Sequence, residues 1–91
     1  MNDSMILEGV VSSDPVQEGI VVRFLFETRD RIFQVSTRDL ISQCVLRYLK
    51  TATPVRIRGY IEAEPTPDDT GYFEAVSIDF LTKSNRTENY K

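Results

Sequence analysis

Residues 55–63 read Val-Arg-Ile-Arg-Gly-Tyr-Ile-Glu-Ala and alternate more regularly than any other stretch of the chain. One face of this stretch holds Val55, Ile57, Gly59, Ile61 and Ala63, and the other holds Arg56, Arg58, Tyr60 and Glu62. A period of two with one apolar face is the pattern of a half-buried strand. A glycine inside such a strand commonly marks a sharp bend or a close approach of another backbone, which a closing barrel needs. The stretch therefore predicts a bent strand whose basic face is exposed.

Three more strands are expected earlier in the chain, because short β-rich runs alternate there with turn signals. They cover residues 5–13, 20–28 and 32–37. The first run ends at Asp14-Pro15, and the charged turn of residues 29–31 joins the other two into a hairpin. The expected core face of the second run holds Ile20, Val22, Phe24 and Phe26.

The apolar period then changes from two to about four. Ile41, Val45 and Leu49 predict a helix over residues 39–50 with one buried stripe. We expect Thr37 or Asp39 to cap its first turn. Cys44 lies beside the stripe, and we expect it to be a small buried apolar group. The last strand is expected over residues 72–82, and its predicted core face holds Tyr72, Val76, Ile78 and Phe80.

The element order is strand, strand, strand, helix, strand, strand. Five strands with a helix between the third and the fourth describe the OB fold, an all-β Greek-key barrel with one helix. A small sheet-plus-helix fold of another topology is the alternative. We expect one OB-fold domain over residues 1–82, with the helix plugging one end of the barrel. Residues 83–91 form a polar segment, which we expect to be a flexible tail.

The composition argues against most catalytic chemistry. The chain has no histidine and one cysteine, so neither a histidine-based acid–base site nor a zinc site is expected. No glycine-rich phosphate-binding motif is present. We therefore expect a protein that is not an enzyme and needs no cofactor or metal. A single cysteine and the absence of a long apolar run favour a cytoplasmic protein without a membrane partner.

Charge is segregated along the chain although the net charge is only −3. Residues 1–22 carry four acidic and no basic side chains, a net −4, and residues 59–91 carry seven acidic and three basic ones, also −4. Residues 23–58 carry eight basic and three acidic side chains, a net +5. Such segregation indicates a basic face on an acidic molecule, and a basic face can meet a polyanion.

Several short motifs of the sequence resemble those of one protein family. Residues 5–15 (MILEGVVSSDP) resemble the opening strand of bacterial single-stranded DNA-binding proteins, in which apolar residues and a glycine precede Asp-Pro. Tyr48-Leu49-Lys50 followed by residues 55–62 (VRIRGYIE) is similar to that family's helix end and fourth strand, and Gly71-Tyr72 is similar to its last hairpin. Primosomal replication protein n, a relative of this family, has a similar layout.

The resemblance spans about residues 5–82 and implies an OB fold that binds single-stranded DNA. Among the features that depart from the family, the turn of residues 29–31 replaces a longer basic hairpin, and the chain has no tryptophan, on which the family commonly stacks bases. The resemblance therefore implies that this chain has the family's fold, but it does not imply the family's affinity for single-stranded DNA.

Single-strand binding needs a cationic groove with aromatic platforms. The best candidates for a nucleic-acid site are Arg23, Phe33, Arg56, Arg58 and Tyr60. A solvated strand face is the competing interpretation for Arg56, Arg58 and Tyr60, and a core position is the competing interpretation for Phe33.

We expect single-stranded nucleic-acid binding without strong sequence preference, in DNA replication, repair or transfer. The alternative is an OB-fold protein–protein assembly module in a larger complex. The expected ligand is single-stranded DNA, with RNA as a second option. We also expect a homo-oligomer or a complex with another replication or assembly protein, because strands that are apolar on both faces leave surface to be covered.

Overall fold

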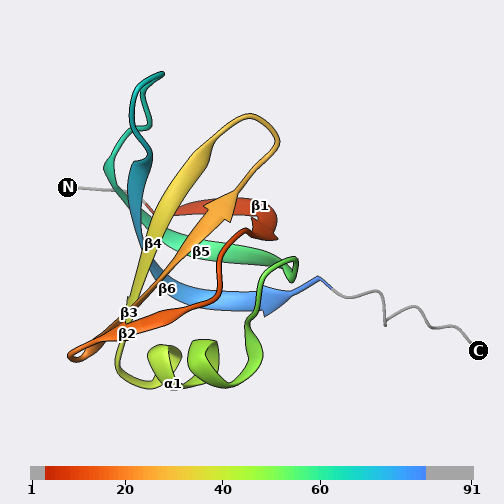
Figure 1. Ribbon diagram of the computed structural model, residues 1–91, viewed down its shortest axis with the longest axis vertical. Coiled ribbons are helices and arrows are strands. Elements are labelled where there is room, and N and C mark those ends of the chain that lie inside the picture. The colour runs from red at the N-terminus through yellow and green to blue at the C-terminus, as the bar shows by residue number, and fades with distance from the viewer. Residues whose placement is uncertain (1–3, 82–91) are drawn as a thin grey trace, which may run out of the picture.

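The structure is a computed structural model that describes residues 4–81 (Figure 1). It is mostly β with one helix. The strands are β1 (Met5–Val11), β2 (Val16–Glu18), β3 (Val21–Glu27), β4 (Ile32–Arg38), β5 (Pro54–Ala63) and β6 (Gly71–Phe80), and the helix is α1 (Asp39–Tyr48). No helix within residues 4–81 is long and apolar enough to cross a membrane.

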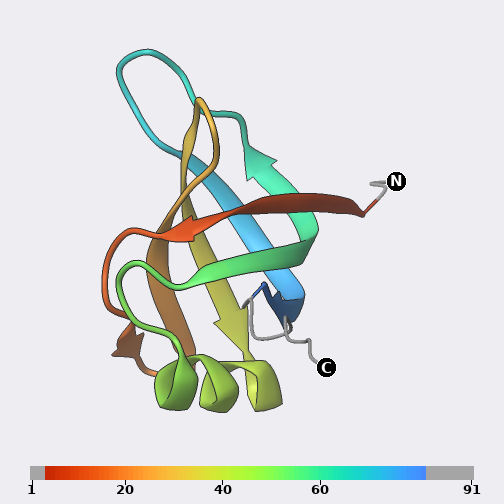
Figure 2. The same cartoon turned by 90° about the vertical axis from the view of Figure 1, so that its right-hand side faces the viewer.

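Five strands form a closed sheet. The strand order is β1-β5-β6-β4-β3-β2, and a further pairing between β1 and β3 joins the ends of the five-strand ring (Figure 2). All pairings are antiparallel except that of β4 with β6. Closure needs close backbone approach at two glycines: a Cβ on Gly9 would collide with the Glu27 carbonyl of β3, and one on Gly59 with the Glu74 carbonyl of β6. The close approach predicted at Gly59 is therefore confirmed.

The core fills the inside of this closed sheet. Its fully buried large side chains include Phe26, Phe33 and Phe73, and the rings of Phe33 and Phe73 meet edge to face with centroids 6.1 Å apart. Helix α1 lies across one end of the sheet (Figures 1 and 2). It contributes the buried Val45, and Leu49, just beyond the helix, joins the same cluster as Ile57 of β5. The helix thus covers one end of the core, as predicted.

Three local predictions about the helix and its neighbourhood are wrong. The helix lies between the fourth and fifth strands, because the three-residue strand β2 precedes β3. All three residues of β2 are exposed, so no apolar pattern marks them. The helix has no side-chain cap, since the buried Thr37 hydroxyl instead donates to the Val22 carbonyl and shares a hydrogen bond with Ser42. Cys44 is exposed, because its side of the helix faces away from the sheet.

The predicted core face of β6 is also wrong over most of the strand. Phe73 and Ala75 are buried, whereas Tyr72 and Val76 are exposed. A register shift between Arg58 and Gly59 of β5 inserts one extra residue into β6, which changes the parity of the strand. Only beyond this bulge, at the half-buried Ile78, do even-numbered residues face inward as predicted.

Candidate nucleic-acid interface

The outward face of β5 presents three of the five candidate residues. Arg56 and Arg58 are exposed and Tyr60 is half-buried, because the opposite face of the strand is in the core. Arg56 Nε donates to Glu8 Oε2 of β1 at 2.7 Å. Arg58 pairs in register with Ile6 of β1 and Ser77 of β6, and it has no ion pair with any residue in 4–81.

Arg23 of β3 lies on the same outer surface, three strands away from Tyr60. The register places Arg23 opposite Ser36, Ser36 opposite Glu74, and Glu74 opposite Tyr60. Directly opposed residues on neighbouring strands project to the same side, and neighbouring strands are about 4.8 Å apart. Arg23 and Tyr60 therefore lie about 14 Å apart along the sheet surface.

Tyr72 is a further aromatic on this surface that the sequence prediction placed in the core. It is 40% exposed, and it pairs in register with Gln34 of β4, one row beyond Ser36. The signal that could have found it is the Tyr72-Phe73 pair, because two successive aromatics on one strand must face opposite sides. We call the surface formed by Arg23, Ser36, Arg56, Arg58, Tyr60, Tyr72 and Glu74 the outer band.

Phe33, in contrast, is no stacking platform in this structure. Its side chain has no exposed surface, and its register partner Phe26 is equally buried. The competing interpretation of Phe33 as a core residue is the one that the structure supports.

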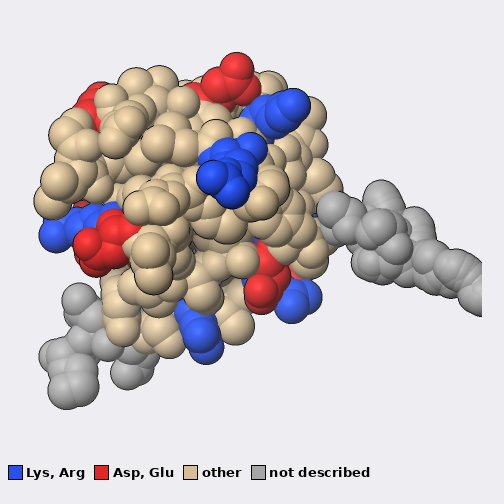
Figure 3. Space-filling view, turned by 90° about the horizontal axis from the view of Figure 1, so that it is seen from below, with Lys and Arg blue, Asp and Glu red and all other residues tan. Residues whose placement is uncertain are grey.

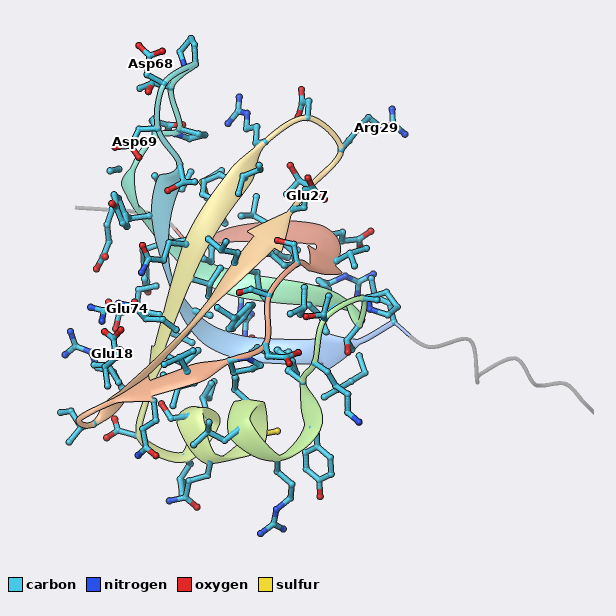
Figure 4. The ribbon with its side chains drawn as sticks, viewed as in Figure 1. Glu18, Glu27, Arg29, Asp68, Asp69 and Glu74 are labelled. Carbon is cyan, nitrogen blue, oxygen red and sulfur yellow. The ribbon has the colours of Figure 1, made fainter. Side chains whose placement is uncertain are left out.

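Most arginines of the outer surface are neutralised by acidic neighbours. Arg23 pairs with Glu18, Arg56 with Glu8, and Arg38 with Glu74 at 3.7 Å. Figure 4 labels Glu18 and Glu74, which come from β2 and β6 and lie on the same side of the molecule. The basic segment of the sequence is therefore interleaved with the acidic segments in space. On the face that carries α1, the charged side chains of residues 4–81 likewise lie apart or beside opposite charges, and they form no continuous basic surface there (Figure 3).

A groove near the end of the β3–β4 hairpin is acidic. It measures about 670 Å³ and lies between the β3–β4 turn and the loop of residues 64–70. Asp30, Glu64, Asp68 and Asp69 line it, with Arg31 as its only basic side chain. Figure 4 shows Asp68 and Asp69 at the end of this loop, and Arg29 on the neighbouring turn. An excess of carboxylates repels phosphates, so we exclude this groove as a nucleic-acid path.

A smaller groove of about 180 Å³ borders the outer band at Arg23 and Leu25. The loop on its rim is held by Asp14, whose carboxylate accepts hydrogen bonds from the backbone N–H and the hydroxyl of Thr51, each at 2.9 Å. The hydrogen bond from the Thr51 backbone lowers the pKa of Asp14 most, and the hydrogen bond from the Thr51 hydroxyl lowers it further. The ionised carboxylate therefore ties the loop after β1 to the loop after α1.

Comparisons with known proteins find similar structures but no similar sequences. No protein-family model and no curated protein matches the chain. Among solved structures, the chain is similar to a small single-stranded DNA-binding protein from Streptomyces coelicolor, with a TM-score of 0.77 and 18% identity over 88% of this chain and 93% of that one.

Two further solved structures share the fold. A second single-stranded DNA-binding protein from Mycobacterium smegmatis has a TM-score of 0.75 and 13% identity over 100% of this chain and 99% of that one. A mitochondrial single-stranded DNA-binding protein from S. cerevisiae has a TM-score of 0.70 and 11% identity over 90% and 96% of the two chains. The resemblance to this group of proteins that the sequence indicated is thereby confirmed at the level of the fold.

Proposed function

We propose that this protein is an OB-type barrel that binds single-stranded DNA on the outer band, without strong sequence preference, in cytoplasmic DNA replication, repair or transfer. The observation that carries the proposal is that Tyr60, Tyr72, Arg58 and Arg23 all project from the outer surface of paired strands, in a fold shared with single-stranded DNA-binding proteins.

Stacking supplies most of the binding free energy in this proposal. A base stacked on an aromatic ring contributes about 1–3 kcal/mol, and any base can stack, so the sequence preference is low. Charge contributes less, because Arg23 and Arg56 must exchange a glutamate for a phosphate. Exposed ion pairs are worth only about 0–1 kcal/mol, so phosphates can displace these glutamates at small cost. We therefore expect weak binding with a shallow salt dependence.

The second candidate function is a protein–protein assembly module. The observation that favours it is the pairing of three outer-surface arginines with glutamates, which leaves little free positive charge for a polyanion. The two functions predict different responses to salt, because a nucleic-acid complex weakens as salt rises, whereas an apolar protein interface does not.

Fluorescence anisotropy with labelled oligo(dT) at low salt tests the proposal. Tyr60→Ala and Tyr72→Ala should each weaken binding by about 1–3 kcal/mol. Leu46→Ala is the control, since Leu46 is an exposed apolar residue of α1 outside the outer band. Arg58→Ala should reduce the slope of log K against log salt by about 0.7, whereas Arg29→Ala at the hairpin turn should not. An unchanged anisotropy at high protein concentration in low salt would exclude DNA binding and favour the assembly module.

A further inference from the structure

Helix α1 and strand β6 together expose a strip of large apolar side chains. The strip consists of Leu40, Cys44 and Tyr48 of α1 with Val76 and Phe80 of β6, and we call it the α1–β6 strip. Leu40 is 79% exposed and Tyr48 is 55% exposed, and the Tyr48 and Phe80 rings meet edge-on at 6.3 Å. Figure 3 shows that uncharged side chains predominate on the end of the molecule that carries α1. Contiguous exposed apolar side chains of this kind mark an interaction surface.

The helical part of the strip is symmetric about its middle residue. Leu40 and Tyr48 each lie four residues from Cys44, which corresponds to about 6 Å along the helix axis in either direction. A two-fold axis through Cys44 would therefore place Leu40 of one copy against Tyr48 of a second copy. Such a self-complementary surface is what a two-fold dimer requires.

The shape of the surface fits the same arrangement. A groove of about 280 Å³ lies at the Leu40 end of the strip, between the start of α1 and the middle of β6. Leu40 and Val76 supply apolar lining. The charged lining residues are Asp39, Glu74 and Arg38, and Arg38 pairs with Glu74, so the groove has one acidic side chain in excess. The exposed Tyr48 at the other end of the strip is the side chain that would enter this groove on a second copy.

The charges at the two ends of α1 are complementary only when the two helices run antiparallel. The start of the helix carries Asp39, and the last turn carries Arg47. Neither Arg47 nor the nearby Lys50 has an ion pair with any residue in 4–81. An antiparallel pair brings Arg47 of each copy to Asp39 at the groove of the other, whereas a parallel pair would bring like charges together.

We propose that a second copy of this chain docks on the α1–β6 strip, forming a two-fold dimer in which the two α1 helices run antiparallel across Cys44 and each Tyr48 fills the groove of the other copy. The dimer uses none of the outer band except Glu74, whose carboxylate lines the groove. Its test needs no nucleic acid, so its outcome is independent of that of the proposed function.

Light scattering on the full chain is the first test, and the expected mass is twice 10.5 kDa at high protein concentration. Leu40→Asp should restore the monomer mass, because it places a carboxylate in the apolar contact beside Asp39 and Glu74. Ile20→Asp is the matched control, since Ile20 is 78% exposed at the β2–β3 turn, and this variant should stay dimeric. Circular dichroism checks that both variants are folded.

Oxidative cross-linking is the second test and does not depend on any destabilising substitution. With copper phenanthroline as the oxidant, two Cys44 thiols at the two-fold axis lose their protons and two electrons and form an intermolecular disulfide. A chain carrying Cys44→Ser and Leu46→Cys places the thiol on another side of the same helix and should not cross-link. A wild-type monomer at all concentrations overturns the proposal, as does a dimer that survives Leu40→Asp and resists cross-linking through Cys44.

Discussion

Replacing Gly59 by alanine tests how the sheet closes. A Cβ at this position would collide with the Glu74 carbonyl oxygen and would lie 2.9 Å from Ala75 Cα, whereas ordinary contact begins at 3.4 Å. Both obstacles are backbone atoms of β6, so no side-chain rotation can relieve them. Overpacking in a core costs about 1–3 kcal/mol, and a clash with backbone belongs at the upper end of this range.

Alanine also reduces the conformational entropy of the unfolded chain. Where the backbone allows the substitution, this effect stabilises the folded state by about 0.4–1 kcal/mol. The net loss in the free energy of unfolding is therefore about 2 kcal/mol. For a domain of this size, each kcal/mol lowers the melting temperature by about 4–8 °C, so we expect a fall of about 8–16 °C.

Differential scanning calorimetry measures this fall directly. The matched control is Gly19→Asn, because Gly19 has a φ of +65° and a Cβ there would meet nothing within 4 Å. Asparagine tolerates this left-handed conformation, so the control should change the melting temperature much less. If Gly59→Ala melts at the wild-type temperature, β5 and β6 do not approach each other as described, and closure does not depend on this glycine.

Three further predictions concern the helix, the loops and the outer surface. Thr37→Val should lower the free energy of unfolding by about 1–2 kcal/mol in a urea titration, since it leaves the buried Ser42 hydroxyl without its partner; an unchanged midpoint would contradict this. Because folding lowers the pKa of Asp14, its contribution to stability should be present above pH 3.8 and should disappear as the pH falls through its folded-state pKa. The melting temperature of Asp14→Asn should therefore be lower than that of the wild type at neutral pH and equal to it in strong acid. A difference that does not depend on pH would argue against stabilisation by the Asp14–Thr51 hydrogen bonds. Glu8→Gln should strengthen oligo(dT) binding more than Glu62→Gln does, because Glu8 pairs with an outer-band arginine; equal gains would show an effect of net charge alone.

Features that depend on local periodicity could be predicted from the sequence without any structure. The alternation of residues 55–63 predicted β5 with the correct faces as far as Ile61, whereas Ala63, beyond a register shift, is exposed. The spacing of Ile41, Val45 and Leu49 located the helix and its buried side. Gly59 was identified because a residue without a side chain, placed inside an otherwise regular strand, commonly marks close backbone approach. In each case the signal lies within a few residues of the feature that it predicts.

Features that depend on distant partners required the three-dimensional arrangement of the chain. Glu8 and Arg56 are 48 residues apart in the sequence, so no local pattern could show that they neutralise each other. The side on which Tyr72 projects depends on a bulge opposite β5, which changes the parity of β6 without any glycine or proline at that point of the strand. Cys44 is exposed because no strand covers its side of α1, and a helical period shows which residues share a face but not which faces find a neighbour.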